Sequence, residues 1–269
     1  MKTWFFKTSA MLSIISWAVI SCSKDGNYDY TTPPQQTPQA TILNAAGDSA
    51  AIIGTINQFR SLLGDSLNLT TGKTTGRREI NWDGVPSTFT NQNNFPFDFF
   101  NSTNAADPAG RKRGLVYTST GTSFRVDSTS FSEIDPSYAN QFTPFSKKRL
   151  FTYIGSNVSE VGFKIAGTNT DAFVHGFGLI FSDVDDANST TLEFFNDNTS
   201  LGVFKAPIRN ASGGFSFLGV NFENEKVTRV KITSGNGVLA TGAKDISDGG
   251  PADLVVMDDF FYDEPKSIQ

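Results

Sequence analysis

Aspartates stand at the ends of several apolar runs in this chain of 269 residues, where their carboxylates could bind a metal ion. The candidate ligands are Asp83, Asp183, Asp185, Asp258 and Asp259. Carboxylate oxygens suit Ca²⁺, which takes six to eight oxygen ligands at about 2.3–2.6 Å. The run that begins at Asp183 does not follow the EF-hand pattern, because Asn188 stands where that loop needs glycine. Calcium is therefore the candidate cofactor, held by aspartates from separate segments.

A second interpretation of the same aspartates is structural. Asp258 and Asp259 are neighbours in an apolar run near the end of the chain. In a regular strand, neighbouring side chains point to opposite faces, so one of the two carboxylates must face the core. A buried carboxylate needs a cation or several hydrogen-bond donors. Arg77, Arg78 or backbone N–H groups could serve as well as calcium, and both interpretations stay open.

Nucleophilic or acid–base catalysis finds little support among the other reactive side chains. The chain has a single histidine, His175, which is flanked by Phe173 and Phe177 and is expected to be a core residue. No serine lies in the Gly-x-Ser-x-Gly pattern of hydrolases. No motif fixes a pair of carboxylates at the separation that glycoside hydrolysis requires. We therefore assign no catalytic residue, and a glycoside hydrolase ranks below the non-catalytic functions.

Aromatic side chains could bind a sugar, because flat rings pack against the apolar faces of pyranoses. The candidates for such a ligand-binding surface are Trp82, Tyr117, Tyr138 and Tyr153. Most of the 25 phenylalanines are expected to fill the core instead. A binding role for the four candidates requires that they are exposed.

One amphipathic helix is predicted over residues 48–63. Its apolar stripe consists of Ile52, Ile56, Phe59 and Leu63, at helical spacing, and is widened by Ile53 and Leu62. Asp48 or Ser49 can cap the first turn, and Gly64 can end the helix. A helix with so broad an apolar face must pack on a larger element.

Beyond Gly64 the chain consists of short apolar runs separated by Gly, Asn, Asp, Ser and Thr. Several runs alternate with a period of two, which favours a mainly β, jelly-roll-like antiparallel β-sandwich. The run 173–181 is expected to form one central strand, covered on both faces. Gly176 and Gly178 within it indicate the close approach of another backbone. Residues 41–265 are expected to form this single domain, including the helix.

The N-terminus reads as an export signal. Residues 1–21 contain two lysines followed by an apolar segment that is too short to span a bilayer. The segment Val19-Ile20-Ser21-Cys22 resembles a bacterial lipobox. The resemblance implies cleavage before Cys22, which frees its amino group, and attachment of diacylglycerol to its thiol, with palmitate among the acyl chains. Residues 22–40 are rich in Pro and Gln and are expected to form a disordered tether. Cys22-Ser23 followed by lysine and acid is similar to lipoproteins of the Bacteroidota type, which implies the outer membrane. Some segments of this type direct export to the cell surface, and the orientation toward the periplasm or outward stays open.

Two motifs carry a wider resemblance. The run GRREINWDG at 76–84 and the run MDDF at 257–260 resemble those of a family of secreted bacterial proteins of uncharacterised function. The resemblance spans about residues 45–265. More loosely, an Asp-Gly segment near the start and an Asp-Asp-aromatic strand at the end resemble jelly-roll modules that bind carbohydrate.

These observations combine into one leading hypothesis on function. The chain is acidic, with a net charge of −5 and a sequence pI of about 4.9, which disfavours nucleic acid as a partner. We expect an exported envelope lipoprotein, attached to the membrane by its lipid, whose sandwich is a non-catalytic module that binds a ligand such as a glycan. The alternative is a structural or assembly protein that docks on another envelope protein.

Overall fold

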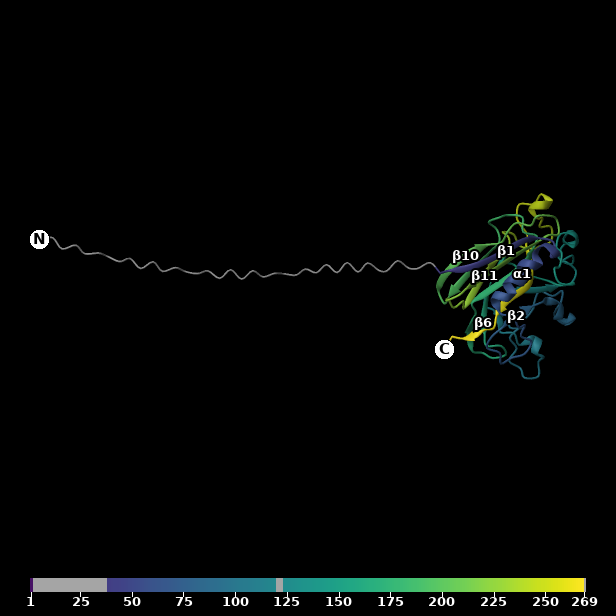
Figure 1. Ribbon diagram of the computed structural model, residues 1–269. Helices are drawn as coiled ribbons and strands as arrows, with labels where there is room; N and C mark the ends of the chain where they lie inside the picture. The colour runs from purple at the N-terminus through teal and green to yellow at the C-terminus, as the bar shows by residue number, and fades with distance from the viewer. Residues whose placement is uncertain (2–37, 120–122, 269) are drawn as a thin grey trace. The chain divides into compact units, whose positions relative to one another are not determined.

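A computed structural model describes residue 1, residues 38–119 and residues 123–268 of the chain. The expected signal peptide, the lipidated Cys22 and nearly all of the expected tether lie outside these residues. Figure 1 shows the described chain folded around two β-sheets, with the single α-helix beside β1 and β11.

Strands dominate the described residues. They are β1 (Ala40–Gly47), β2 (Arg77–Ile80), β3 (Leu115–Tyr117), β4 (Ser123–Asp127), β5 (Leu150–Ile154), β6 (Val158–Lys164), β7 (Asp171–Phe173), β8 (Gly176–Ser182), β9 (Thr191–Asn196), β10 (Thr199–Lys205), β11 (Phe215–Phe222), β12 (Arg229–Thr233), β13 (Val256–Asp263) and β14 (Lys266–Ser267). The helix α1 spans Ser49–Leu63. Short 3₁₀ turns occur at Trp82–Gly84, Ser87–Phe89, Ala109–Arg111, Pro136–Asn140 and Ile246–Asp248.

The strands form two antiparallel sheets. One has the order β1-β11-β8-β13-β5-β4, with β2 also paired to β13, and the other has the order β10-β9-β12-β6-β7-β14, with β3 paired to β6. Within them, β5-β13-β8-β11 and β6-β12-β9-β10 are two four-stranded blocks, and the chain passes back and forth between them. This is the strand order of a jelly roll, so the predicted fold class is confirmed.

The core between the sheets is largely aromatic. Phe177, Phe181 and Phe260 reach it from the centre of the first sheet, where they are fully buried. Trp82 lies flat on Phe151, with ring centroids 4.2 Å apart and an interplanar angle of 3°. Burial of such rings contributes about 1.5–3 kcal/mol each, so this layer is the main source of stability.

The helix α1 packs on the outer face of the first sheet. Its buried residues are the predicted stripe Ile52, Ile56, Phe59 and Leu63, while Ile53 and Leu62 are exposed and do not widen it. Asp48 accepts a hydrogen bond from the Ala51 N–H, and the Gly64 N–H donates to the Arg60 carbonyl, as expected for the two caps. The exposed pair faces solvent because the sheet contacts only one side of the helix.

Two glycines in neighbouring strands make room for this helix. Gly178 pairs with Gly219, and the ring of Phe59 lies over both of them. A Cβ at Gly178 would stand 2.8 Å from Phe59 Cε1 and 2.7 Å from the Gly219 Cα. The close approach of another backbone predicted at Gly178 is therefore confirmed.

The expected continuous strand 173–181 is wrong in one respect. β7 ends at Phe173 in one sheet, and β8 begins at Gly176 in the other. The Asp263 carboxylate accepts the backbone N–H groups of His175 and Gly176, so these two groups are satisfied outside a strand ladder. His175 is consequently part of a crossover between the sheets rather than of a core strand.

Candidate functional site

Asp258 and Asp259 lie at a β-bulge in the middle of β13. Met257 pairs with Phe181 and Phe260 pairs with Leu179, so two residues of β13 stand opposite one residue of β8. Met257 and Phe260 both face the core between the sheets. The expectation that the two aspartates point to opposite faces is therefore wrong, because the bulge turns both carboxylates toward the 145–146 loop.

The bulge carboxylates are held by backbone donors. Asp258 accepts hydrogen bonds from the N–H groups of Phe145, at 2.6 Å, and Ser146, at 3.3 Å. The Ser146 hydroxyl lies 3.1 Å from Asp258 Oδ1 and 2.8 Å from Asp259 Oδ1. Burial and the adjacent Asp259 carboxyl raise the pKa of Asp258 well above its usual range, and burial also raises that of Asp259. Of the partners considered from the sequence, backbone N–H groups are the ones observed, while Arg77 pairs with Glu79 and Arg78 with Glu264.

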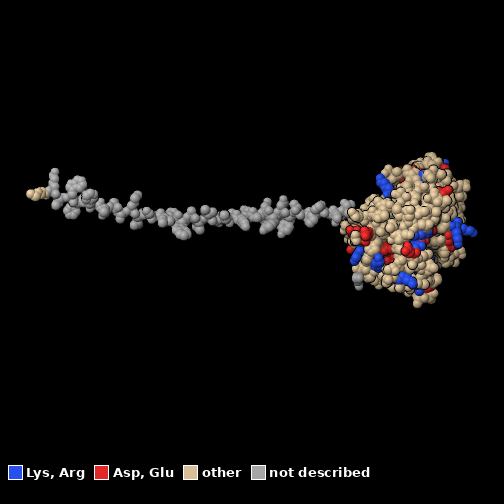
Figure 2. Space-filling model, viewed as in Figure 1, with Lys and Arg blue, Asp and Glu red and all other residues tan. Residues whose placement is uncertain are grey.

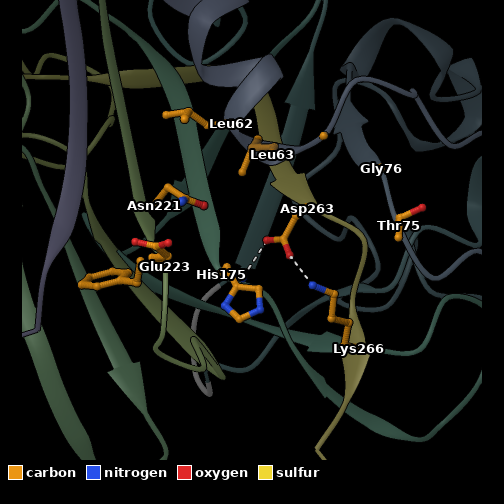
Figure 3. Close-up of a pocket in the computed structure, with 11 residues that line it drawn as sticks. Leu62, Leu63, Thr75, Gly76, His175, Asn221, Glu223, Asp263 and Lys266 are labelled. Carbon is orange, nitrogen blue, oxygen red and sulfur yellow. Dashed lines mark hydrogen bonds and ion pairs between the residues drawn. The ribbon is translucent and has the colours of Figure 1, made fainter.

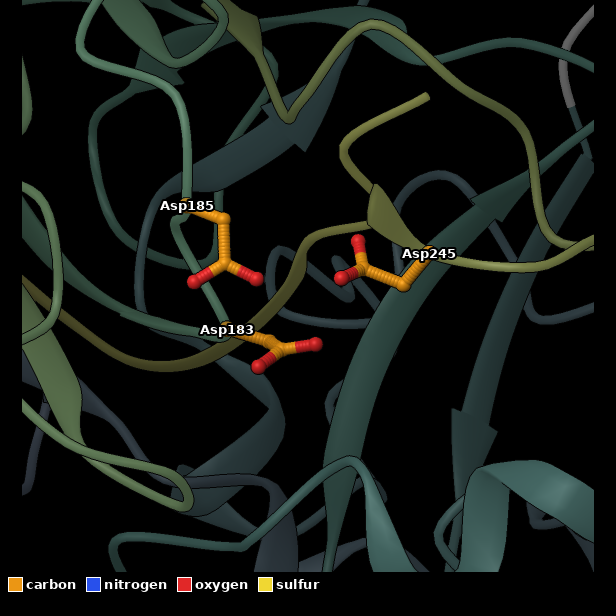
Figure 4. Close-up of side chains that lie close together, drawn as sticks. All are labelled: Asp183, Asp185 and Asp245. Atoms are coloured by element: carbon orange, nitrogen blue, oxygen red, sulfur yellow. The ribbon is translucent and has the colours of Figure 1, made fainter. Parts of the chain in front are cut away.

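The remaining aspartates form a separate cluster at the end of β8. Asp183, Asp185 and Asp245 each offer a carboxylate oxygen, and these oxygens lie within 4.8 Å of one another. Figure 4 shows the three side chains converging from the segment after β8 and from the loop after β12. Among the described residues, this is the group whose geometry could hold a cation such as calcium.

Arg209 already supplies a positive charge to this cluster. Its guanidinium donates to both oxygens of Asp185, at 2.5 and 2.8 Å, and also forms an ion pair with Asp183. Gln141 donates to the other oxygen of Asp183 at 2.7 Å. The cluster is therefore built as a buried ion-pair network, into which a metal ion would have to compete with Arg209.

Burial sets the protonation of this cluster. It raises the pKa of Asp183 to about 7, although Gln141 and Arg209 oppose the shift. Burial also raises the pKa of Asp185. Burial disfavours the ionised form of Asp245 too, but backbone hydrogen bonds from Leu254 and Ser247 outweigh it and lower its pKa. Near neutral pH the Asp183 carboxyl group is therefore partly protonated, which lowers the negative charge of the cluster.

Asp83 belongs neither to the bulge pair nor to the cluster of three aspartates. Its Oδ1 accepts the Lys148 N–H at 3.0 Å. Its carbonyl accepts a hydrogen bond from Arg149 at 2.6 Å. Asp83 therefore anchors the start of the segment that leads into β5.

The four aromatic candidates for a ligand-binding surface are all buried in the core, so they do not form such a surface. Trp82, Tyr117, Tyr138 and Tyr153 are 0, 4, 0 and 1% exposed. The Trp82 indole N–H donates to the Asp258 carbonyl at 3.0 Å, and the Tyr138 hydroxyl donates to the Ala240 carbonyl at 2.9 Å. Burial also raises the pKa of Tyr117 and Tyr153 well above the usual range. Each ring packs on phenylalanine rings of the core and offers no face to a ligand in solution.

A pocket of about 330 Å³ lies instead where α1 ends beside the crossover at His175. Apolar walls come from Leu62, Leu63 and Phe222, and polar groups come from Thr75, His175, Asn221, Glu223, Asp263 and Lys266. Figure 3 shows the His175 ring between Glu223 on one side and Lys266 on the other, with Asp263 above it. The pocket therefore combines an apolar wall with several converging polar side chains.

Asp263 is the buried anchor of this pocket. Its Oδ1 accepts the N–H groups of His175 at 2.6 Å and Gly176 at 2.9 Å. Its Oδ2 has no hydrogen-bond partner, and the Lys266 ammonium is 3.8 Å away. Burial raises the pKa of Asp263, against the effect of the two N–H donors. This carboxyl group fixes the backbone that carries His175.

Sequence reasoning did not find this pocket. The pocket is formed by α1, the β7–β8 crossover, the end of β11 and the end of β13, which are far apart in the chain. The one signal available was His175, the only histidine, and its two phenylalanine neighbours indicated a core residue instead. Asp245 carried no signal that would separate it from other loop aspartates.

Comparisons of this chain with protein families, with curated proteins and with solved structures gave no match. Among the described residues, no helix is both long enough and apolar enough to span a membrane. Acidic and basic side chains are intermixed on the face seen in Figure 2, where neither sign forms a broad area.

Proposed function

We propose that this chain is an exported, lipid-anchored envelope protein whose β-sandwich is a non-catalytic module that binds a hydroxyl-rich ligand, such as the end of a glycan, in the His175 pocket. The pocket itself carries the proposal. Small-molecule sites are concave, measure about 300–1,000 Å³ and combine apolar walls with a few placed polar groups. The observed pocket has that size and that composition.

The polar groups of the pocket suit sugar hydroxyls. Asn221 offers both an amide donor and a carbonyl acceptor, Glu223 offers an exposed carboxylate and Lys266 offers an ammonium group. A sugar presents many hydroxyls that both donate and accept, together with an apolar ring face that could lie on Leu62 and Leu63. These pairings support a polyhydroxylated ligand over a purely apolar one.

The carboxylate pairs do not favour a hydrolase. Asp183, Asp245 and Asp258 are at most 1% exposed, and Asp259 is 6% exposed. Asp183 is bound by Arg209 and Gln141, and Asp258 by the N–H groups of Phe145 and Ser146. Asp245 accepts the N–H groups of Ser247 and Leu254, and Asp259 accepts the Ser146 hydroxyl. A catalytic carboxyl group must reach the bond that it cleaves, and these groups face protein donors instead.

Docking on another protein is supported by no single apolar surface in the described part of the chain. The exposed large apolar side chains there stand on different elements and loops, such as Ile42 on β1, Phe97 in the loop after β2 and Val203 on β10. Apolar residues scattered singly are normal on a monomer. The pocket therefore remains the better-supported feature.

The test is a titration of the purified protein with a panel of mono- and disaccharides, followed by saturation-transfer NMR. Glu223→Gln removes one charge from the pocket, and Asp98→Asn removes one from an exposed side chain that does not line it. A hydrogen bond to a charged group is worth about 1.5–3 kcal/mol and a neutral one about 0.5–1.5 kcal/mol. Because Gln keeps a neutral acceptor, Glu223→Gln should weaken binding about fivefold to tenfold. Asp98→Asn should bind like the wild type. Binding of no sugar in the panel, or equal loss in both variants, would contradict the proposal.

A further inference from the structure

The orientation of the His175 ring is fixed by its surroundings. Asp263 holds the backbone N–H groups of His175 and Gly176. The ring of Phe173 meets the imidazole edge to face, with centroids 5.3 Å apart. Backbone and ring are thus both constrained, although His175 lies outside a regular strand.

One hydrogen bond determines where the imidazole proton lies. His175 Nδ1 is 2.9 Å from the carbonyl oxygen of Glu225. A carbonyl oxygen can only accept, so Nδ1 must carry the proton. In the neutral ring, Nε2 is then an unprotonated nitrogen with a free lone pair. Within the described part of the chain, no residue donates a hydrogen bond to Nε2.

The charged groups around the ring leave this lone pair available. Glu223 and Asp263 carry acceptor oxygens only, so neither can satisfy Nε2 when ionised. Lys266 forms an ion pair with Asp263, with 3.8 Å between its ammonium nitrogen and Oδ2, and the hydrogen bond found for the ring is the one at Nδ1. Lys226 lies over the Phe173 ring at 5.0 Å, and Glu225 faces the ring through its backbone carbonyl. A hydroxyl group of a bound ligand can therefore supply the donor for Nε2.

We infer that His175 is the specificity-determining residue of this pocket, and that its unprotonated Nε2 accepts a hydrogen bond from one hydroxyl group of a bound sugar. The inference rests on the proposed function and names the contact that would select the ligand. A site built to pair with a hydroxyl rejects an analogue that lacks it, because its own polar group is left unpaired. Deoxy and fluoro analogues at the contacting position should therefore bind poorly.

The single histidine makes the inference directly measurable. The imidazole nitrogens of the ¹⁵N-labelled protein give one ring spectrum, in which protonated and unprotonated nitrogens differ widely in chemical shift. We expect a protonated Nδ1 and an unprotonated Nε2 in the free protein. Titration with the sugar that binds best in the panel above should shift Nε2 strongly. An Nε2-protonated tautomer in the free protein would overturn the inference.

Two variants test the roles of the two ring nitrogens separately. His175→Asn keeps a donor near the position of Nδ1 and removes the acceptor, whereas His175→Gln keeps an acceptor near the position of Nε2. A single hydrogen bond in the range of about 0.5–1.5 kcal/mol predicts a loss of about twofold to tenfold for His175→Asn. His175→Gln should retain most of the affinity. The deoxy analogue should lose affinity for the wild type but not for His175→Asn.

The outcomes distinguish the inference from the proposed function. A sugar that shifts Asn221 and Glu223 but leaves Nε2 unchanged would overturn the role of His175 and leave the binding module intact. Equal loss in His175→Asn and His175→Gln would also overturn it, provided that both variants keep the wild-type urea midpoint. A correct tautomer without any sugar-induced shift in the pocket would overturn the proposed function, and the sugar contact with it.

Discussion

Replacing Asp183 by Asn is a direct test of the buried aspartate cluster. Burial raises the pKa of Asp183 from 3.8 to about 7, so the native state binds a proton that the unfolded chain releases. Asn has the shape and neutrality of the protonated acid and can still accept the hydrogen bond from Gln141. The substitution therefore removes the titration while it keeps most of the packing.

The sign of the effect follows from the direction of the shift. A carboxyl group whose pKa is raised in the native state stabilises the fold fully below its unfolded pKa, and this contribution is lost as the pH rises through the native pKa. The native and unfolded pKa values of Asp183 differ by about three units. At roughly 1.4 kcal/mol per unit, the stability of the wild type relative to Asp183→Asn should fall by up to about 4 kcal/mol between pH 4 and 7.

Urea unfolding at a series of pH values measures this difference. Asp171→Asn is the matched control, because the Asp171 side chain is 72% exposed. The control and the wild type should have stability curves of the same shape. If wild type and Asp183→Asn also gave parallel curves from pH 4 to 7, Asp183 would titrate normally, and the assignment of a buried, partly protonated cluster would be refuted.

Four further results are expected. Gly178→Ala should cost about 1–3 kcal/mol in urea unfolding, because the new Cβ meets a ring of α1 at 2.8 Å; Gly54→Ala, with open space around it in the helix, should gain up to about 1 kcal/mol. Asp258→Ala should cost about 1–3 kcal/mol by leaving backbone donors unpaired, whereas Asp258→Asn should stay close to wild type at neutral pH. Added Ca²⁺ should raise the thermal midpoint of Arg209→Gln more than that of wild type, because the substitution removes the competing cation; equal responses would argue against calcium at this cluster. Cys22→Ala should abolish incorporation of labelled palmitate in a Gram-negative host, and continued labelling would exclude Cys22 as the acylated residue.

The features that sequence predicts well here depend on near neighbours. The buried stripe of α1 and both of its caps follow from residue types three or four positions apart. The sandwich follows from short alternating runs. By contrast, the width of the stripe was overestimated at Ile53 and Leu62, since only the contacting sheet decides how much of a helix is covered.

Exposure is the property that sequence could not supply for the aromatic candidates. Trp82 and Tyr138 have flat rings that could pack on a sugar, but both are buried, and the Asp258 and Ala240 carbonyls satisfy their polar groups inside the fold. A buried tyrosine or tryptophan needs only one acceptor. Such an acceptor comes from a segment more than one hundred residues away, and no local pattern reveals it.

The aspartates show how a one-residue irregularity changes a functional interpretation. Strict alternation at Asp258 and Asp259 would place one carboxylate inside the core, where a cation, an arginine or several backbone donors would have to balance it. The bulge in β13 places both on the outer face, where the backbone of the 145–146 loop holds Asp258 and the Ser146 hydroxyl holds Asp259. A metal ion is then no longer required at these two residues. The case for a cation rests on Asp183, Asp185 and Asp245 alone, which the jelly-roll topology brings together, and there it depends on whether a metal can displace Arg209.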